Sequence, residues 1–138
     1  MNARPSPPPP PPNPLELSFS ADAVQLATVR RALRDWLSRT RITADQCADV
    51  LLAVGEACTN AIEHGHRLDG GTIRLRSWIV GDFLQVTVSD SGCWKPNDNH
   101  ADPLRGRGIP LMRALMESMR MSTNRSGTVV ELGTAIRS

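Results

Sequence analysis

Apolar residues along the chain alternate first with the period of a strand and then with the period of a helix. Residues 15–20, LELSFS, alternate apolar and polar side chains, which is typical of a half-buried strand. From about Asp22 to Ser38 the apolar positions recur every three or four residues, so this segment is predicted to be an amphipathic helix. Its polar face either is solvated or contacts a partner protein, and it carries Arg30, Arg31 and Arg34.

A second helix is predicted from about Ala44 to His64. Thr43 and Gln46 have capping-box spacing at its start, and Gly65 follows as a left-handed stop. At about 100° per residue, one face of this helix is apolar. That face consists of Val50, Leu51, Val54, Cys58, Ala61 and Ile62.

The opposite face of the same helix carries Glu56, Asn60 and His64 at positions i, i+4 and i+8. Such residues on a helix are often simply solvated. They also suit a charged ligand, because a carboxylate accepts a proton and an amide oxygen binds a hard cation. Both interpretations stay open from this helix alone.

The next segments predict a hairpin that ends in an acidic residue. Strands are expected at about Thr72–Val80 and Phe83–Ser89, joined by a turn at residues 81–82. Asp90 comes directly after the second strand, where an Asp and a following Gly usually make only a turn.

The last third of the chain contains a long loop, a helix and a strand. Residues 91–108 are rich in Gly, Pro, Asn and Asp and are predicted to be a loop that closes as a lid. A helix is expected from about Ile109 to Met119, a turn at 124–127 and a final strand at Thr128–Ile136. The fold class is therefore α+β: a two-layer sandwich of a mostly antiparallel mixed sheet with helices on one face.

The composition excludes some classes of function but does not identify one. The 138 residues are 40% hydrophobic and 22% charged, as expected for one soluble globular domain. A net charge of +2 without a concentrated basic stripe argues against direct nucleic-acid binding. Neither a signal peptide nor a membrane span is recognised, and the three cysteines have no metal-ligand spacing, so a cytoplasmic protein is expected.

Residues 1–14 contain eight prolines and are predicted to be a disordered proline-rich tail, with the domain occupying residues 15–138. A ligand for a proline-binding module is the alternative for this tail.

Gly106, Arg107 and Gly108 precede the predicted third helix. Amide groups at a helix N-terminus favour a phosphate, glycine allows close approach and arginine adds a donor. A short Gly-Arg-Gly sequence is equally well a hinge. The order of all these motifs along the chain is more specific than any one of them.

In the order of these motifs along the chain, residues 15–136 resemble the histidine-kinase-like (GHKL, Bergerat-fold) ATPases. Glu56, Asn60 and His64 look like the N-box of that superfamily, Asp90 and Gly92 like its first glycine box, and 106–108 like its second. Within the superfamily the chain is similar to the small anti-sigma-factor serine kinases of the RsbW and SpoIIAB type.

The resemblance implies a role for each motif. Asn60 would coordinate the Mg²⁺ that bridges the ATP phosphates, and Glu56 would be the general base on a protein serine. Asp90 would accept a hydrogen bond from the adenine amino group, with Thr128 supporting that end. Residues 106–108 would hold the β- and γ-phosphates. The expected partners are a sigma factor, an anti-sigma-factor antagonist that accepts the phosphoryl group, and a second copy of the chain, with the sheet edge near the first strand as one contact.

The resemblance has one departure and two functional alternatives. Trp94 occupies the position of the second glycine in a D-x-G-x-G box, and a side chain of this size affects how an adenine base is positioned there. His64 and His66 make only a weak zinc signal. An ATP-sensing binder without kinase activity is the main alternative, although the presence of Glu56 favours the kinase. Self-contained ATP hydrolysis is disfavoured because no transducer domain is present.

Overall fold

The structure, a computed structural model, describes residues 12–66, 71–90, 105–124 and 127–137. Its elements follow one another in the order β1 (Leu15–Ser20), a 3₁₀ turn (Ala23–Gln25), α1 (Leu26–Leu37), α2 (Ala44–His66), β2 (Thr72–Val80), β3 (Phe83–Asp90), α3 (Arg105–Leu115), β4 (Ser118–Asn124) and β5 (Gly127–Ala135).

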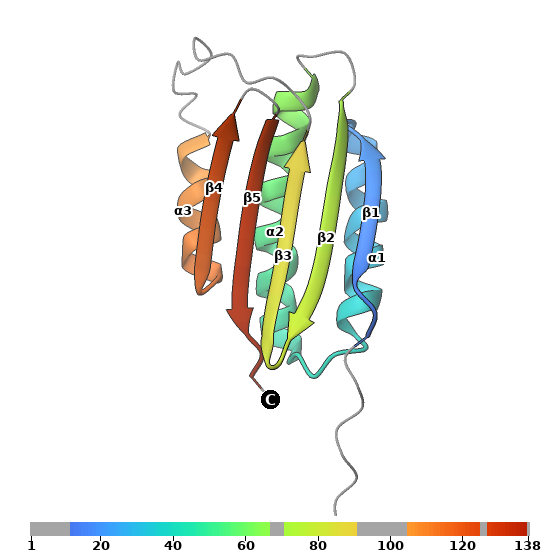
Figure 1. The fold of residues 1–138 in the computed structure, drawn as a ribbon, viewed down its shortest axis with the longest axis vertical. Coiled ribbons are helices and arrows are strands. Elements are labelled where there is room, and N and C mark those ends of the chain that lie inside the picture. Colours follow the sequence, from blue (N-terminus) through green and yellow to red (C-terminus); the bar gives the residue numbers. More distant parts are fainter. Residues whose placement is uncertain (1–11, 67–70, 91–104, 125–126, 138) are drawn as a thin grey trace, which may run out of the picture.

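The strands form one sheet in the order β1-β2-β3-β5-β4, and every neighbouring pair is antiparallel. Figure 1 shows α1, α2 and α3 on the same face of this sheet, with α2 behind its centre and α3 behind the β4 edge. The predicted α+β sandwich with helices on one face is therefore confirmed, and its described strands contain no parallel pair.

The core lies between the sheet and the three helices. Alternate residues of β3 are fully buried and face the helices, as the period of two requires. The apolar face of α2 packs against them, and so do the inward residues of α1. The largest fully buried side chains include Leu33, Leu37, Val50, Val54, Leu75, Leu84, Val86 and Met112.

The start of α2 is held by residues that the capping-box spacing identified. Thr43 Oγ1 accepts a hydrogen bond from the Gln46 backbone N–H at 3.2 Å. The Gln46 side chain does not complete the box, because its amide donates to the Ala135 carbonyl at 2.5 Å and its carbonyl accepts from the Arg137 N–H at 3.0 Å. Gln46 therefore ties α2 to the end of β5.

The predicted end of α2 and the predicted start of α3 are both wrong. The helix α2 continues through Gly65 to His66, since a glycine inside a helix costs only about 1 kcal/mol and does not by itself end it. The helix α3 begins at Arg105, so residues 106–108 lie in its first turn and not before it. Their amide groups still belong to a helix N-terminus.

The strand β4 was not predicted. The apolar residues from Ile109 to Met119 continue at helical spacing, so the helix was expected to run through Met119. In the structure α3 ends at Leu115, and residues 118–124 pair with β5. Pairing with the edge of the sheet outweighs the local helical pattern here.

The turn between β2 and β3 is confirmed at Gly81 and Asp82, with Gly81 at a φ of 62° that suits glycine. Residues 1–11 of the predicted tail lie outside the described residues. At the junction with the domain, the buried Trp36 donates its indole N–H to the Asn13 carbonyl at 2.7 Å.

Candidate functional site

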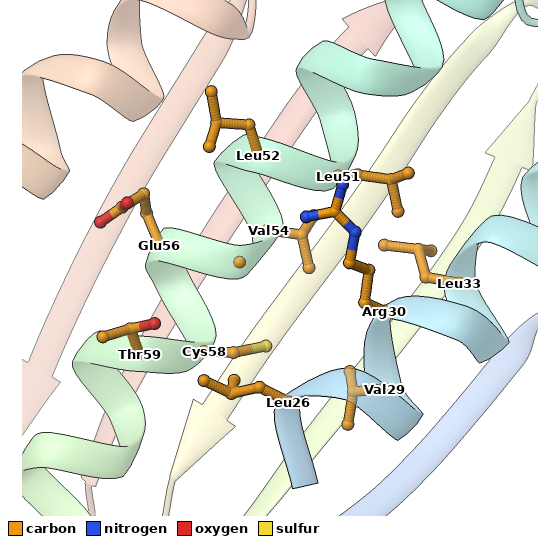
Figure 2. A pocket seen from close by; sticks show the side chains of 11 residues that line it. Leu26, Val29, Arg30, Leu33, Leu51, Leu52, Val54, Glu56, Cys58 and Thr59 are labelled. Carbon is orange, nitrogen blue, oxygen red and sulfur yellow. The ribbon is translucent and has the colours of Figure 1, made fainter. Parts of the chain in front are cut away.

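The helix α2 separates two environments. Its core face is buried against the sheet, whereas Glu56 and Asn60 are only half-buried and lie on the side that faces α3. The side chain of Glu56 extends away from α1 (Figure 2). The predicted division of this helix into a core face and a polar face is thus present in the structure.

The first turn of α3 lies directly on this polar face. A Cβ atom placed on Gly108 would lie 3.2 Å from Asn60 Nδ2 and 3.4 Å from Glu56 Oε2. A glycine at this position therefore leaves room between the two helices for the carboxylate and the amide. The structure brings Gly108 close to Glu56 and Asn60, although it is far from both in the sequence.

This region has the elements needed to bind a phosphate and a hard cation. The unpaired amide groups of the α3 N-terminus carry a partial positive charge, which attracts an anion. Next to them, Asn60 Oδ1 is an oxygen ligand of the kind that Mg²⁺ prefers, and Glu56 supplies a carboxylate. The donor set suits a nucleotide phosphate with its magnesium ion.

A second pair of polar residues lies at the same end of the sheet. Asp90 ends β3, Thr128 is its register partner near the start of β5, and both are buried. Within the described part of the chain, Thr128 Oγ1 is a buried atom without a hydrogen-bond partner. Such an atom is costly unless a ligand satisfies it, so the pair suits the polar edge of a base.

Figure 1 shows how the fold gathers these residues. The end of α2, the end of β3, the beginning of β5 and the beginning of α3 all lie at one end of the molecule. A ligand that extends from the Asp90 and Thr128 pair to the first turn of α3 would span this end of the helix layer.

Several predicted site residues cannot be placed. Gly92, Cys93 and Trp94, with the rest of the predicted lid up to residue 104, lie outside the described residues. The backbones of residues 64–66 and 105–107 are described as helix, but the side chains of His64 and Arg107 are not. Among the described residues, no three His, Cys, Asp or Glu side chains form a cluster that could hold a metal.

Cys58 lies on the core face of α2, and its burial raises the pKa of its thiol to about 12. A thiol with such a pKa stays protonated and is a poor nucleophile. Cys58 is accordingly part of the core and takes no part in the chemistry of the polar face.

No sequence pattern predicts the cavity of about 230 Å³ that lies between α1 and α2, on the far side of α2 from α3 (Figure 2). Arg30 reaches into it from α1, and Glu56 and Thr59 lie at its border. Its wall is mainly apolar, so it is a poor phosphate site. The lining residues are Leu26, Val29, Arg30, Leu33, Leu51, Leu52, Val54, Gly55, Glu56, Cys58 and Thr59.

The fold is that of a histidine kinase-like ATPase domain, as comparison with known proteins shows. Residues 19–134 match the family described as the histidine kinase-like ATPase domain, and the chain belongs to this family. In the described part of the chain, no helix is long and apolar enough to cross a membrane.

Within the family, the chain is similar to RsbW. It is 30% identical over 132 residues to the serine-protein kinase RsbW of Bacillus subtilis (strain 168), covering 85% of this chain and 82% of the relative. A crystal structure of the RsbU and RsbW domains of a Mycobacterium tuberculosis protein superposes with a TM-score of 0.75 at 27% identity. That match covers 91% of this chain and 33% of the other.

A histidine kinase domain from Erythrobacter litoralis shares the fold, with a TM-score of 0.59 at 22% identity over 82% of this chain and 60% of the other. Together the comparisons confirm the predicted resemblance to RsbW-type members of the GHKL superfamily.

Proposed function

We propose that this chain is an ATP- and Mg²⁺-dependent protein-serine kinase that phosphorylates an anti-sigma-factor antagonist and sequesters a sigma factor. Its relatives that are named serine-protein kinase RsbW support the class of enzyme. The observation that supports the chemistry best is the position of Gly108 beside both Glu56 and Asn60, where a Cβ atom would lie 3.4 Å from Glu56 Oε2 and 3.2 Å from Asn60 Nδ2. This proximity supports a site at which a base, an oxygen ligand and a helix N-terminus act together.

The described residues have separable tasks in this proposal. Bound Mg²⁺·ATP supplies the transferable phosphoryl group and the cation that neutralises its charge. The first turn of α3 holds the phosphates, and Gly108 keeps the approach to α2 open. Asn60 Oδ1 holds the cation, and Thr128 Oγ1 with Asp90 binds the adenine end. His64, Gly92, Gly106 and Arg107 complete the proposed nucleotide contacts.

Glu56 is the proposed general base. Its carboxylate would take the proton of the incoming serine hydroxyl while Asn60, one turn further along α2, positions the cation at the same phosphate. Because both side chains come from one rigid helix, their separation does not depend on a flexible loop. The serine acceptor itself must come from the partner protein.

The proposal includes partners and a compartment. In one state the chain binds the small antagonist, which provides the serine. In another state it binds the sigma factor, and the exchange between these two partners regulates transcription. The chain acts as a homodimer in the cytoplasm. Residues 1–14 form a tail outside the catalytic domain of residues 15–138.

The experiment that tests this function is capture of partners from the native cytoplasm in Mg²⁺ and ATP, followed by intact-mass analysis of each small partner. Glu56→Gln, which keeps the size of the side chain and removes its basicity, is the matched control. A phosphoryl mass on a partner serine with the wild type alone supports the kinase. A sigma factor retained with no phosphorylated partner in either sample would instead indicate an ATP-sensing binder.

A further inference from the structure

The cavity between α1 and α2 has no role in the proposed function. Its volume is about 230 Å³, and it lies on the side of α2 away from α3 (Figure 2). An apolar cavity of about 150 Å³ in another protein stays dry and takes up a molecule of the size of benzene. The cavity between α1 and α2 is larger, so it has room for a ring with a short substituent, or for about nine non-hydrogen atoms.

The inner wall of this cavity is apolar. Val29 and Leu33 of α1 and Val54 and Cys58 of α2 line it, and none of these four residues is more than 5% exposed. The Cys58 thiol adds no charge, because burial raises its pKa to about 12. Water finds few hydrogen-bond partners on such a surface, so an apolar group fills the space better than water does.

Gly55 keeps this space open. A Cβ atom placed on Gly55 would meet no described atom within 4 Å, so the packing of the described residues does not require a glycine here. Gly108 is different, because a Cβ atom there would lie 3.2 Å from Asn60 Nδ2. Glycine also lowers the stability of a helix interior. A destabilising glycine that the packing does not need is expected if another molecule fills the space beside it.

A cationic side chain lies at the rim of the cavity. Arg30 reaches over it from α1 (Figure 2), and this residue is exposed. Within the described part of the chain, no residue forms a hydrogen bond or an ion pair with the guanidinium group. Glu56 borders the same cavity, but its side chain extends away from α1 and does not neutralise Arg30. The guanidinium group is therefore available to an anion.

We propose that this cavity binds a small ionised carboxylic acid with an apolar ring or chain. The apolar part lies between α1 and α2 beside Gly55, and the carboxylate accepts hydrogen bonds from the Arg30 guanidinium group at the rim. These two groups match in geometry, because two N–H donors of the guanidinium meet two carboxylate oxygens. The proposal depends neither on the kinase activity nor on the nucleotide site.

The charges at the rim select an anion with one negative charge. Arg30 is the only cationic residue among the described lining residues, whereas a phosphate ester carries nearly two negative charges at neutral pH. Glu56 at the border would repel the second charge. A nucleotide is also much larger than the cavity, so this site is separate from the region beside Gly108. A neutral apolar molecule would fill the space but leave the guanidinium group without a partner.

Phenylacetate and its neutral analogue phenylacetamide test the site in the full chain. In a titration of the isotope-labelled chain followed by NMR, phenylacetate should shift backbone amide signals of α1 and α2 around Arg30 and Gly55. For a ligand of this size we expect a dissociation constant of about 1 mM. Phenylacetamide should bind at the same place about fivefold more weakly, because it lacks the charge.

Arg30→Gln tests the carboxylate contact. It should weaken phenylacetate binding about fivefold and leave phenylacetamide binding unchanged, because only the acid uses the positive charge. Arg31→Gln is the matched control, since Arg31 is the next residue of α1, is also exposed and is not among the described lining residues. This control should leave both affinities unchanged. Equal losses in the two variants, or an equal loss for the two compounds, would overturn the role of Arg30.

Gly55→Met tests the cavity itself. The flexible methionine side chain should occupy the space beside residue 55, and methionine suits a helix better than glycine does. The variant should therefore unfold at a higher urea concentration and lose measurable binding of both compounds. Gly55→Ala adds only a methyl group and should keep most of the affinity. Wild-type affinity for phenylacetate in Gly55→Met would place the ligand elsewhere and overturn the proposal.

The wild-type titration decides whether a small acid is the occupant. If neither compound shifts the signals of α1 and α2 at concentrations well above the expected dissociation constant, the proposal is wrong. Loss of a captured protein partner from Gly55→Met in that case would assign the space to a protein interface instead. Mg²⁺·ATP affinity should be unchanged in Arg30→Gln and Gly55→Met, so it reports on the nucleotide site separately.

Discussion

Gly108→Ala is the substitution that examines the candidate site most closely. The added methyl group would lie 3.2 Å from Asn60 Nδ2, 3.4 Å from Glu56 Oε2 and 3.6 Å from Asn60 Oδ1. The 3.2 Å distance is a few tenths of an ångström shorter than an ordinary contact, and the 3.4 Å distance lies at the lower limit of ordinary contacts. The affected atoms are the ends of flexible side chains, so these can move without disturbing the backbone.

The expected effects on folding and binding are therefore different. Replacing glycine by alanine inside a helix stabilises it by roughly 0.5–1 kcal/mol, which offsets the cost of moving Asn60 and Glu56. The free energy of unfolding should thus change by less than about 1 kcal/mol. The same displacement moves the cation ligand and the base away from the phosphate, so Mg²⁺·ATP affinity should fall at least tenfold, or about 1.4 kcal/mol.

Gly55→Ala is the matched control, because Gly55 also lies in a helix and a Cβ atom there would meet nothing within 4 Å. Urea unfolding and titration calorimetry with Mg²⁺·ATP measure both quantities on each variant. Gly55→Ala should unfold at a higher urea concentration and bind nucleotide as the wild type does. Wild-type nucleotide affinity in Gly108→Ala would refute the placement of the phosphates beside this residue.

Three further predictions follow from single side chains. Asn60→Ala should weaken nucleotide binding in Mg²⁺ while leaving the weaker metal-free binding unchanged, and equal Mg²⁺ dependence in titration calorimetry would exclude Asn60 as the cation ligand. Thr128→Val removes a buried hydroxyl that has no hydrogen-bond partner in the described structure, so the temperature of thermal unfolding without ligand should rise. The affinity for ATP should fall, and an unchanged affinity would exclude contact of Thr128 with the base. Burial raises the pKa of the Cys58 thiol from 9.0 to about 12, so as the pH rises the thiol loses its proton in the unfolded chain before it does so in the folded protein. The free energy of unfolding should therefore fall by about 1.4 kcal/mol per pH unit from pH 9 towards pH 12. In urea titrations at these pH values, Cys58→Ala should lack this part of the decline, and an identical slope in both proteins would contradict it.

Local patterns were sufficient to predict most of the fold. The helix α2 was predicted from a period of 3.6 that separates Val54 and Cys58 from Glu56 and Asn60, and the structure buries the first pair and leaves the second half-buried. The β2–β3 hairpin follows from two runs of strand-forming residues around one short turn. In these segments the local preference and the tertiary structure agree.

The errors in the predicted elements lie in segments whose secondary structure is determined by tertiary contacts. Met119 continues the helical spacing of α3 but also begins an alternation with Met121, and pairing with β5 selects the strand. The end of α2 was misplaced for a related reason, since glycine permits a helix stop without requiring one.

The geometry of the candidate site also could not be predicted from local sequence patterns. The spacing of Glu56 and Asn60 predicted a shared helix face, but not that Gly108 lies beside both. The register that pairs Asp90 with Thr128 depends on the order of strands in the sheet, which no local pattern specifies. The cavity between α1 and α2 is likewise a result of helix packing.

The most direct measurement of the central claim is a crystal structure of the chain with Mg²⁺ and a non-hydrolysable ATP analogue. The account predicts the cation in contact with Asn60 Oδ1, the phosphates at the first turn of α3 and the base beside Asp90 and Thr128. A nucleotide bound in the cavity between α1 and α2, or a cation without contact to Asn60, would contradict it.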